Sequence, residues 1–270
     1  MILYLAAHRR PAARRGLTLI ELVVVMAILA ALAGILIPTL SGMLNRAHSS
    51  SSATNISEVA KLIQTYHTQY LGYPDNFDSL VTSTTGTQAT YLLPQDVTAS
   101  PDFTSVTLDD DLTESLHHAG IKNVTQMVEK AANTTTGNYR WNPTFYPYAA
   151  PIAPQTTPAT TPIAEGSVFL GLNGAAAARE FSAPATATYV MFGIGKYSTL
   201  SRSMLDAPVH FGSEADSAPQ MVYSRYLVVF QLTDADNVPL ENAKMVGIGA
   251  LHHGSVSSVG SHLNEYFAAD

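Results

Sequence analysis

An uninterrupted apolar run, LVVVMAILAALAGILI, occupies residues 22–37 and contains no charged or strongly polar side chain. As an α-helix this run extends roughly 24 Å. Apolar residues on either side bring it to the length of about 20 residues that a membrane span requires. Four arginines precede the run and few positive charges follow it. We therefore expect a cytoplasmic N-terminus and place residues 45–270 outside the cytoplasm.

A second helical pattern follows the apolar run and differs from it in periodicity. Apolar residues recur there at steps of three and four, which marks one helical face: Ile56, Val59, Ala60, Ile63, Tyr66 and Tyr70. Gly72 and Pro74 supply a stop signal. The pattern predicts one helix from about Thr18 to Leu71, hydrophobic all round in residues 17–44 and amphipathic in residues 45–72.

The remaining sequence, residues 73–270, predicts a globular head. Four runs rich in β-branched and aromatic residues read as strands: Val168–Leu172, Thr188–Ile194, Val222–Leu232 and Met245–Leu251. We therefore predict an α+β fold, in which the long helix packs on an antiparallel sheet within residues 166–270.

Residues 73–142 read as the loop and helical part of the head. Within them, residues 82–111 form a polar loop with a small anchor at Tyr91–Leu93, and Leu112–Ala132 is helical with a break at Gly120. Six prolines then make residues 143–165 an extended connector.

Composition narrows the possible functions. Of the 14 basic residues, four lie before residue 17, and the rest of the chain carries ten basic against 21 acidic side chains. That acidic balance lacks the basic surface of a nucleic-acid binder. The chain has no cysteine, which excludes disulfides, thiolate metal sites and cysteine nucleophiles.

A short motif stands between the arginines and the apolar run. The six residues Gly16-Leu17-Thr18-Leu19-Ile20-Glu21 follow Arg14-Arg15 directly. This arrangement resembles the class III signal of type IV pilins and type II secretion pseudopilins. The resemblance implies that a prepilin peptidase cleaves between Gly16 and Leu17 and that Leu17 becomes N-methylated. It also assigns Thr18, Glu21 and Pro38 to the assembly segment, and makes residues 1–16 a leader peptide.

Glu21 is the one charged residue between Leu17 and Leu44. A carboxylate within a bilayer costs a few kcal/mol on insertion scales and usually has a partner. The resemblance implies that Glu21 meets the N-terminal amine of a neighbouring subunit, which would cancel two buried charges and fix the axial register. The alternative is an interfacial acid near a helix N-terminus, where the helix dipole favours negative charge.

Two other interpretations of the N-terminus stay open. An ordinary secretory signal would be cleaved after Ala31-Leu32-Ala33, which would leave an apolar new N-terminus and give Glu21 no role. A plain signal-anchor would remain uncleaved.

A second, looser resemblance to major pseudopilins extends to about residue 81, through Tyr73-Pro74 and Leu80-Val81.

Catalytic motifs are absent from the head, and we predict no enzymatic activity. The sequence contains neither G-x-S-x-G nor H-E-x-x-H, and Gly193-Ile194-Gly195-Lys196 reads as a strand end. The histidine pairs 117–118 and 252–253 read as surface residues, and Asp109–Asp111 as a solvated loop and helix start. Asp234 and Asp236 follow a strand and offer alternating oxygen ligands for calcium, with an Asx-rich turn as the alternative. We expect no other cofactor.

These observations predict a structural subunit of a type II secretion pseudopilus or related type IV pilus-like filament. The resemblance implies as partners a prepilin peptidase, other pilin or pseudopilin subunits, the inner-membrane assembly machinery and secreted cargo. It implies a single-pass protein of the inner membrane with a periplasmic head, found in a filament after assembly. The alternatives are a membrane-anchored extracytoplasmic binding protein that does not polymerise, and an anchored hydrolase without a recognisable motif.

Overall fold

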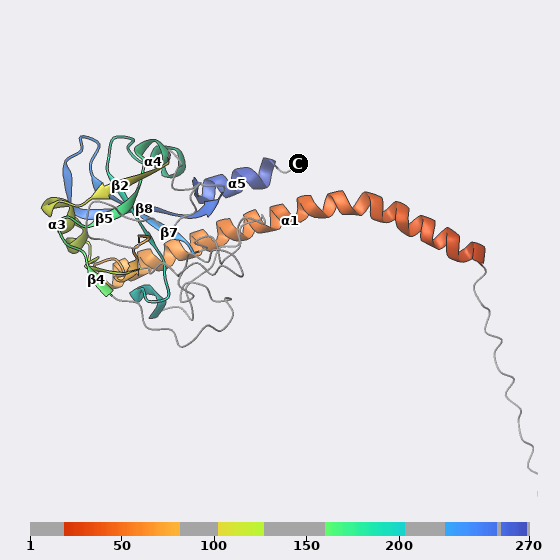
Figure 1. Cartoon of the computed structure of the whole chain (residues 1–270), viewed down its shortest axis with the longest axis horizontal. Helices are drawn as coiled ribbons and strands as arrows, with labels where there is room; N and C mark the ends of the chain where they lie inside the picture. The colour runs from red at the N-terminus through yellow and green to blue at the C-terminus, as the bar shows by residue number, and fades with distance from the viewer. Residues whose placement is uncertain (1–18, 82–101, 127–159, 203–224, 253–254, 269–270) are drawn as a thin grey trace, which may run out of the picture. The chain divides into compact units, whose positions relative to one another are not determined.

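The computed structural model describes residues 19–81, 102–126, 160–202, 225–252 and 255–268 (Figure 1). The chain divides into two compact units, Met1–Leu44 and Asn45–Asp270. The predicted anchor Tyr91–Leu93 and most of the predicted connector over residues 143–165 lie outside the described residues.

The first element is the long helix α1, Leu19–Tyr70. Its bounds lie within one residue of the helix predicted from the apolar and amphipathic patterns. Serine-rich residues 48–55, weak helix formers by themselves, are helical here. Hydroxyl groups in this part of α1 donate to the carbonyl four residues earlier, Thr54 to Ser50 and Ser57 to Ala53. These bonds satisfy the hydroxyls without breaking the helix.

In the second unit, α1 contributes one face to the core. Ile56, Val59 and Ile63 are buried, at the three-to-four spacing of that face. They belong to one hydrophobic cluster with strand residues such as Phe192 and Phe230. The fold is therefore α+β, with the N-terminal helix contributing to the core of a mostly antiparallel sheet.

Within the described residues, nine strands make up the sheet. In chain order they are β1 Phe77–Asp78, β2 Phe103–Thr107, β3 Asn123–Thr125, β4 Thr160–Pro162, β5 Val168–Leu172, β6 Tyr189–Gly193, β7 Leu227–Thr233, β8 Pro239–His252 and β9 Ser255–Ser257. Their order is β4-β3-β1-β6-β7-β8-β9, with β2 joined through β5 to β6. All pairings are antiparallel except β1 with β3.

Strand β6 is the hub of the sheet. It pairs along its whole length with β7, from Tyr189↔Gln231 to Gly193↔Leu227. Its other edge is shared, because β5 pairs with its first residues and β1 pairs with Gly193 at its end. Each of the four predicted strands is present, and Gly193 does end a strand.

Short helices complete the head: α3 Asp110–His118, α4 Gly174–Phe181, the 3₁₀ helix η2 Thr199–Arg202 and α5 Val259–Ala268. The helix predicted before Gly120 is confirmed by α3, whereas the helix predicted after it was wrong at Asn123–Thr125, which is strand β3. Residues 127–132 of that prediction lie outside the described residues. Gly120 ends α3 with φ +96°, and a Cβ there would lie 3.1 Å from the backbone N and O of Tyr73. The loop predicted over residues 82–111 was also wrong in part, since β2 lies within it.

Among the residues described, none of the helices combines the length and hydropathy that crossing a bilayer requires.

Candidate functional site

The N-terminal part of α1 presents an apolar surface. All residues from Leu19 to Gly34 are exposed in the single chain, with Leu19 80% and Ile20 71% accessible. Burying one such side chain contributes about 1.5–3 kcal/mol, and monomeric soluble proteins rarely expose apolar patches of this extent. This segment therefore requires a covering of protein or lipid.

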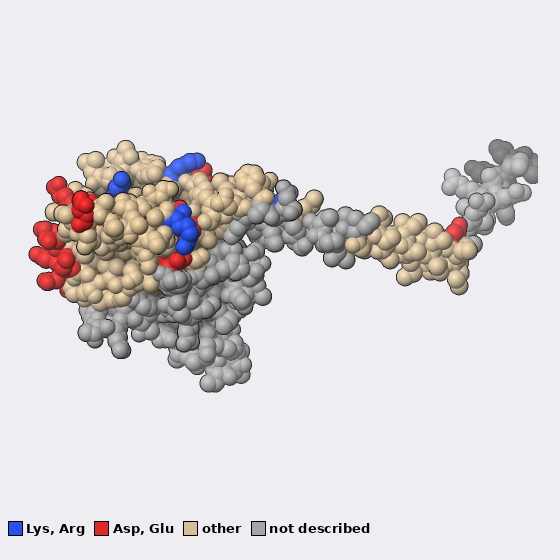
Figure 2. All heavy atoms as spheres, turned by 90° about the horizontal axis from the view of Figure 1, so that it is seen from above, with Lys and Arg blue, Asp and Glu red and all other residues tan. Residues whose placement is uncertain are grey.

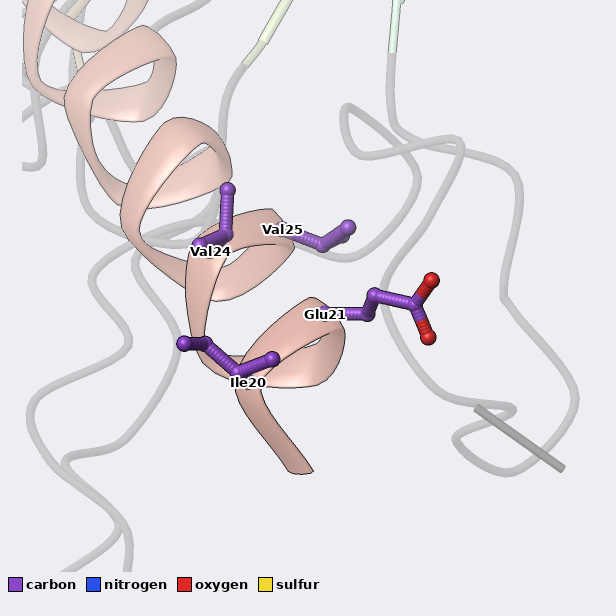
Figure 3. A pocket seen from close by; sticks show the side chains of 4 residues that line it. All are labelled: Ile20, Glu21, Val24 and Val25. Atoms are coloured by element: carbon purple, nitrogen blue, oxygen red, sulfur yellow. The ribbon is translucent and has the colours of Figure 1, made fainter. Parts of the chain in front are cut away.

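Glu21 lies in the first turn of α1, within that apolar surface. Together with Ile20, Val24 and Val25 it lines a shallow hollow on the helix. Figure 3 shows its carboxylate at the end of an extended side chain, directed away from the helix. The first turn is a favourable place for an acid because the helix dipole is positive there.

Other residues assigned to processing and assembly are described in part. Gly16, Leu17 and Thr18 lie outside the described residues. The helical backbone continues through Pro38. At Gly34 a Cβ would meet no atom within 4 Å, so packing within the described chain does not require a glycine at that position.

The segment after α1 joins the helix to the head. Tyr73 donates its backbone N–H to Ala119 O at 2.7 Å, and its hydroxyl accepts from Met245 N at 3.2 Å. Asp75 accepts three hydrogen bonds: its Oδ1 from Lys122 N at 2.9 Å and Asn123 N at 2.7 Å, and its Oδ2 from Asn123 Nδ2 at 2.8 Å. Sequence reasoning singled out Tyr73-Pro74 but missed Asp75, although Pro-Asp-Asn is a typical turn composition.

The histidines of the head make separate contacts. His117 Nε2 lies 3.0 Å from Ile163 O, and His118 Nδ1 lies 3.0 Å from Glu241 O. His262 is buried, whereas His210 and His253 lie outside the described residues. Within the described part of the chain, no three His, Asp or Glu side chains gather closely enough to hold a metal ion.

The acidic residues of the head take structural positions. Asp109 caps α3 through an Oδ1 that accepts from Leu112 N at 2.8 Å, as expected for a helix start. Asp234 Oδ1 accepts from the backbone N–H of Asp236 and Val238, both at 2.9 Å, in the turn between β7 and β8. This is the geometry of an Asx turn. Calcium binding at Asp234 and Asp236 stays a prediction.

A charged network that the sequence did not indicate connects three elements of the head. Arg179 on α4 binds Asp102 through both terminal nitrogens and Glu180 through Nε. Glu180 Oε2 also accepts from Ser258 N at 3.1 Å and Ser261 Oγ at 2.5 Å, at the start of α5. Burial alone would raise the pKa of Glu180, but the hydrogen bonds from Ser261, Arg179 and Ser258 outweigh it and lower that pKa.

Comparison with known proteins identifies the N-terminal segment. Residues 11–37 match the family described as the prokaryotic N-terminal methylation motif. This chain carries a type IV pilin-like prepilin signal. The motif indicates a type IV pilin-like substrate of a prepilin peptidase, and it points to a structural rather than an enzymatic protein. No curated protein and no solved structure matches the chain.

Proposed function

We propose that the chain is a structural subunit of a type II secretion pseudopilus or a related type IV pilus-like filament. The observation that carries this proposal is the placement of the prepilin signal at the start of an exposed apolar helix. A signal that served only secretion would be removed after export and would leave no apolar helix in the mature chain. A subunit that packs through this helix against its neighbours does need one.

The proposed assembly starts from processing between Gly16 and Leu17. Cleavage and methylation leave a cationic amine on Leu17, four residues before Glu21. Before assembly, residues 17–44 hold the subunit in the inner membrane with the head in the periplasm. In the filament, the same residues pack against other subunits.

Glu21 gives this packing its register. Its side chain leaves the helix beside the apolar side chains of Ile20, Val24 and Val25. In the apolar interior of a filament a carboxylate is costly, and a neighbouring cation removes most of that cost. The amine of a neighbouring Leu17 supplies the cation, so only one axial offset between adjacent helices satisfies both charges. The inner-membrane assembly machinery would add subunits at the base.

Mass spectrometry of the native membrane and surface fractions tests the processing step. An N-methylated Leu17 is the expected mature N-terminus. A mature chain that begins at Gly34 would indicate ordinary secretion, and one that keeps Met1 would indicate a plain anchor. Either result would contradict the proposed function.

Substitution of Glu21 tests assembly separately from processing. We expect Glu21→Ala to be inserted and processed normally but to be lost from sheared filament fractions. Glu58→Ala, an exposed glutamate on the same helix, should assemble in normal amounts. Filaments of Glu21→Ala equal to wild type would refute the pairing. Wild-type protein that is processed yet found only as detergent-soluble monomers would favour the membrane-anchored binding protein.

A further inference from the structure

An exposed apolar patch lies in the head where α1 ends. We call it the distal patch, and it consists of Tyr66, Tyr70 and Leu71. The rings of Tyr66 and Tyr70 lie 4.5 Å apart, and Tyr70 and Leu71 are 67% and 86% exposed. Aromatic side chains are enriched at protein interfaces relative to the rest of the surface. A tyrosine pair beside an exposed leucine is therefore typical of a contact site.

The backbone at Leu71 is a second, independent feature of the distal patch. Leu71 has φ +55° and donates its N–H to His67 O at 2.8 Å, which is the αL motif that ends many helices. Glycine is the usual residue at this position, because it adopts a positive φ without strain. The exposed leucine side chain gains almost no burial within the head that would offset this strain. Burial against another molecule would offset it.

A second apolar patch lies on α5. We call it the α5 patch, and it consists of Leu263, Tyr266 and Phe267, whose spacing of three and four places them on one helix face. Phe267 is 69% exposed, and its ring lies 5.3 Å from that of Tyr266. On the same helix, Val259 and His262 pack onto the head instead. The α5 patch therefore lies on the outer side of α5.

The two patches lie at opposite ends of the head, and strand β8 relates their positions. Directly after the distal patch, the Tyr73 hydroxyl accepts from Met245 N in β8. Helix α5 follows β9, which pairs with the last residues of β8, Ala250 to His252. Met245 and His252 are separated by roughly 23 Å of extended strand. Figure 1 shows α5 on one side of the head and the end of α1 on the other, beside α3 and β4. The two patches can therefore meet only between two copies of the chain.

Charge disfavours contact between two distal patches. Helix α3 lies at the same end of the head, and its carboxylates Asp110, Asp111 and Glu114 are exposed. Figure 2 shows acidic side chains gathered at that end of the head. Two copies that met through their distal patches would bring these like charges together, which opposes binding. Helix α5 contains a single acid, Glu265, so the α5 patch of a second copy meets less repulsion.

We propose that the distal patch of one copy docks onto the α5 patch of a second copy. Because the two patches differ, each bound copy keeps one patch open for a further neighbour, and repetition extends a fibre. The six side chains expose less than the ~1,200 Å² that a stable free complex buries. The contact therefore forms where helix α1 already holds subunits together. This inference rests on the proposed filament and adds the heads to its interface.

Disulfide cross-linking tests this contact, because the chain has no cysteine of its own. The double variant Leu71→Cys, Phe267→Cys, oxidised in sheared filaments, should give a ladder of dimers, trimers and larger species that a reductant dissolves. Each single variant should stay monomeric, and the two single variants produced together should stop at dimers. The control Glu58→Cys, Phe267→Cys has its first cysteine at an exposed position of α1 outside the distal patch, and it should give no ladder.

The outcomes separate this contact from the proposed function. Disulfide dimers of either single variant would show a symmetric contact and overturn the inference. Filaments of the double variant that give no ladder would also overturn it, while the proposed function would stand. If the wild type forms no filaments, the proposed function fails. Oxidation of the double variant in intact membranes then decides the contact by itself, because the absence of a ladder there would overturn the inference.

Leu71→Gly separates docking from folding. Glycine relieves the positive φ, so the melting temperature of the head should not fall, yet the amount of sheared filaments should fall about threefold. Phe267→Ser should lower the amount of filaments similarly at an unchanged melting temperature. The control Val238→Ser alters an exposed valine outside both patches and should change neither quantity. Filaments of Leu71→Gly and Phe267→Ser as abundant as those of Val238→Ser would overturn the inference.

Discussion

Asp75 provides the sharpest test of how the helix is joined to the head. Its carboxylate accepts from Lys122 N, Asn123 N and Asn123 Nδ2, and thereby ties the end of α1 to the connection between α3 and β3. Asp75→Ala removes all three acceptor contacts. Asp75→Asn keeps one carbonyl oxygen for the two backbone donors but turns an amide nitrogen toward Asn123 Nδ2.

The size of the effect follows from these contacts. A hydrogen bond to a charged group contributes about 1.5–3 kcal/mol, and a neutral one about 0.5–1.5 kcal/mol. Because Asp75 is half-buried and its bond to Lys122 is exposed, we take about 1 kcal/mol for each bond. Asp75→Ala should then cost about 3 kcal/mol and lower the melting temperature by about 6–12 °C, and Asp75→Asn about a third of that.

Near-UV circular dichroism of the full chain in neutral detergent measures this loss, because it reports the packed tyrosines of the head. Asp236→Ala is the control, since its side chain forms no hydrogen bond with the described residues and should melt as wild type does. A melting temperature for Asp75→Ala within about 2 °C of the control would refute the reasoning. An equal fall in melting temperature for Asp75→Ala and Asp75→Asn would show that the stabilisation comes from the charge of the carboxylate and not from the geometry of its hydrogen bonds.

Three further substitutions test the packing and charge of the head. Gly120→Ala should lower the free energy of unfolding by about 2 kcal/mol or more, because φ at Gly120 is +96° and the backbone of Tyr73 crowds the new Cβ. Its control is Gly166→Ala, which should cost only about 1 kcal/mol because φ is +79° there but the space is open. Urea denaturation measures both variants. Ile63→Ala should lower the free energy of unfolding by about 2–5 kcal/mol in the same assay, since Ile63 is fully buried. Gln64→Ala, at the exposed neighbouring position, should change that free energy little. The folded-state pKa of Glu180 is lowered, so its contribution to stability is present at neutral pH and is lost on acidification. The gap in melting temperature between wild type and Glu180→Gln should therefore narrow from neutral pH to about pH 3.

The sequence predicted best those elements whose pattern is local and strong. The bounds of α1 followed from hydrophobic periodicity and a glycine–proline stop, and β5 and β6 followed from short runs of buried residues. Strands β2 and β3 were missed for a physical reason. Three of the five residues of β2 are serine or threonine, and β3 has three residues, so each owes its conformation to a partner strand rather than to its own pattern.

The candidate sites also differ in how far the sequence alone predicts them. The prepilin signal is a contiguous motif, so residues 11–37 could be identified from the sequence alone. The charged contact between Arg179 and Asp102 could not, because the two residues are far apart in the sequence and meet only in the folded head.

The position of β6 as hub of the sheet also sets the order of events during biogenesis. One end of β6 pairs with β1, from the beginning of the head, and its other edge pairs with β7, which follows much later in the sequence. Helix α1 forms from local contacts as soon as it is synthesised, whereas the sheet cannot close before β7 has been delivered. Until β7 arrives, β6 presents an open edge to any strand nearby. Closure of this edge therefore depends on β7, which makes Leu227–Thr233 decisive for escaping aggregation.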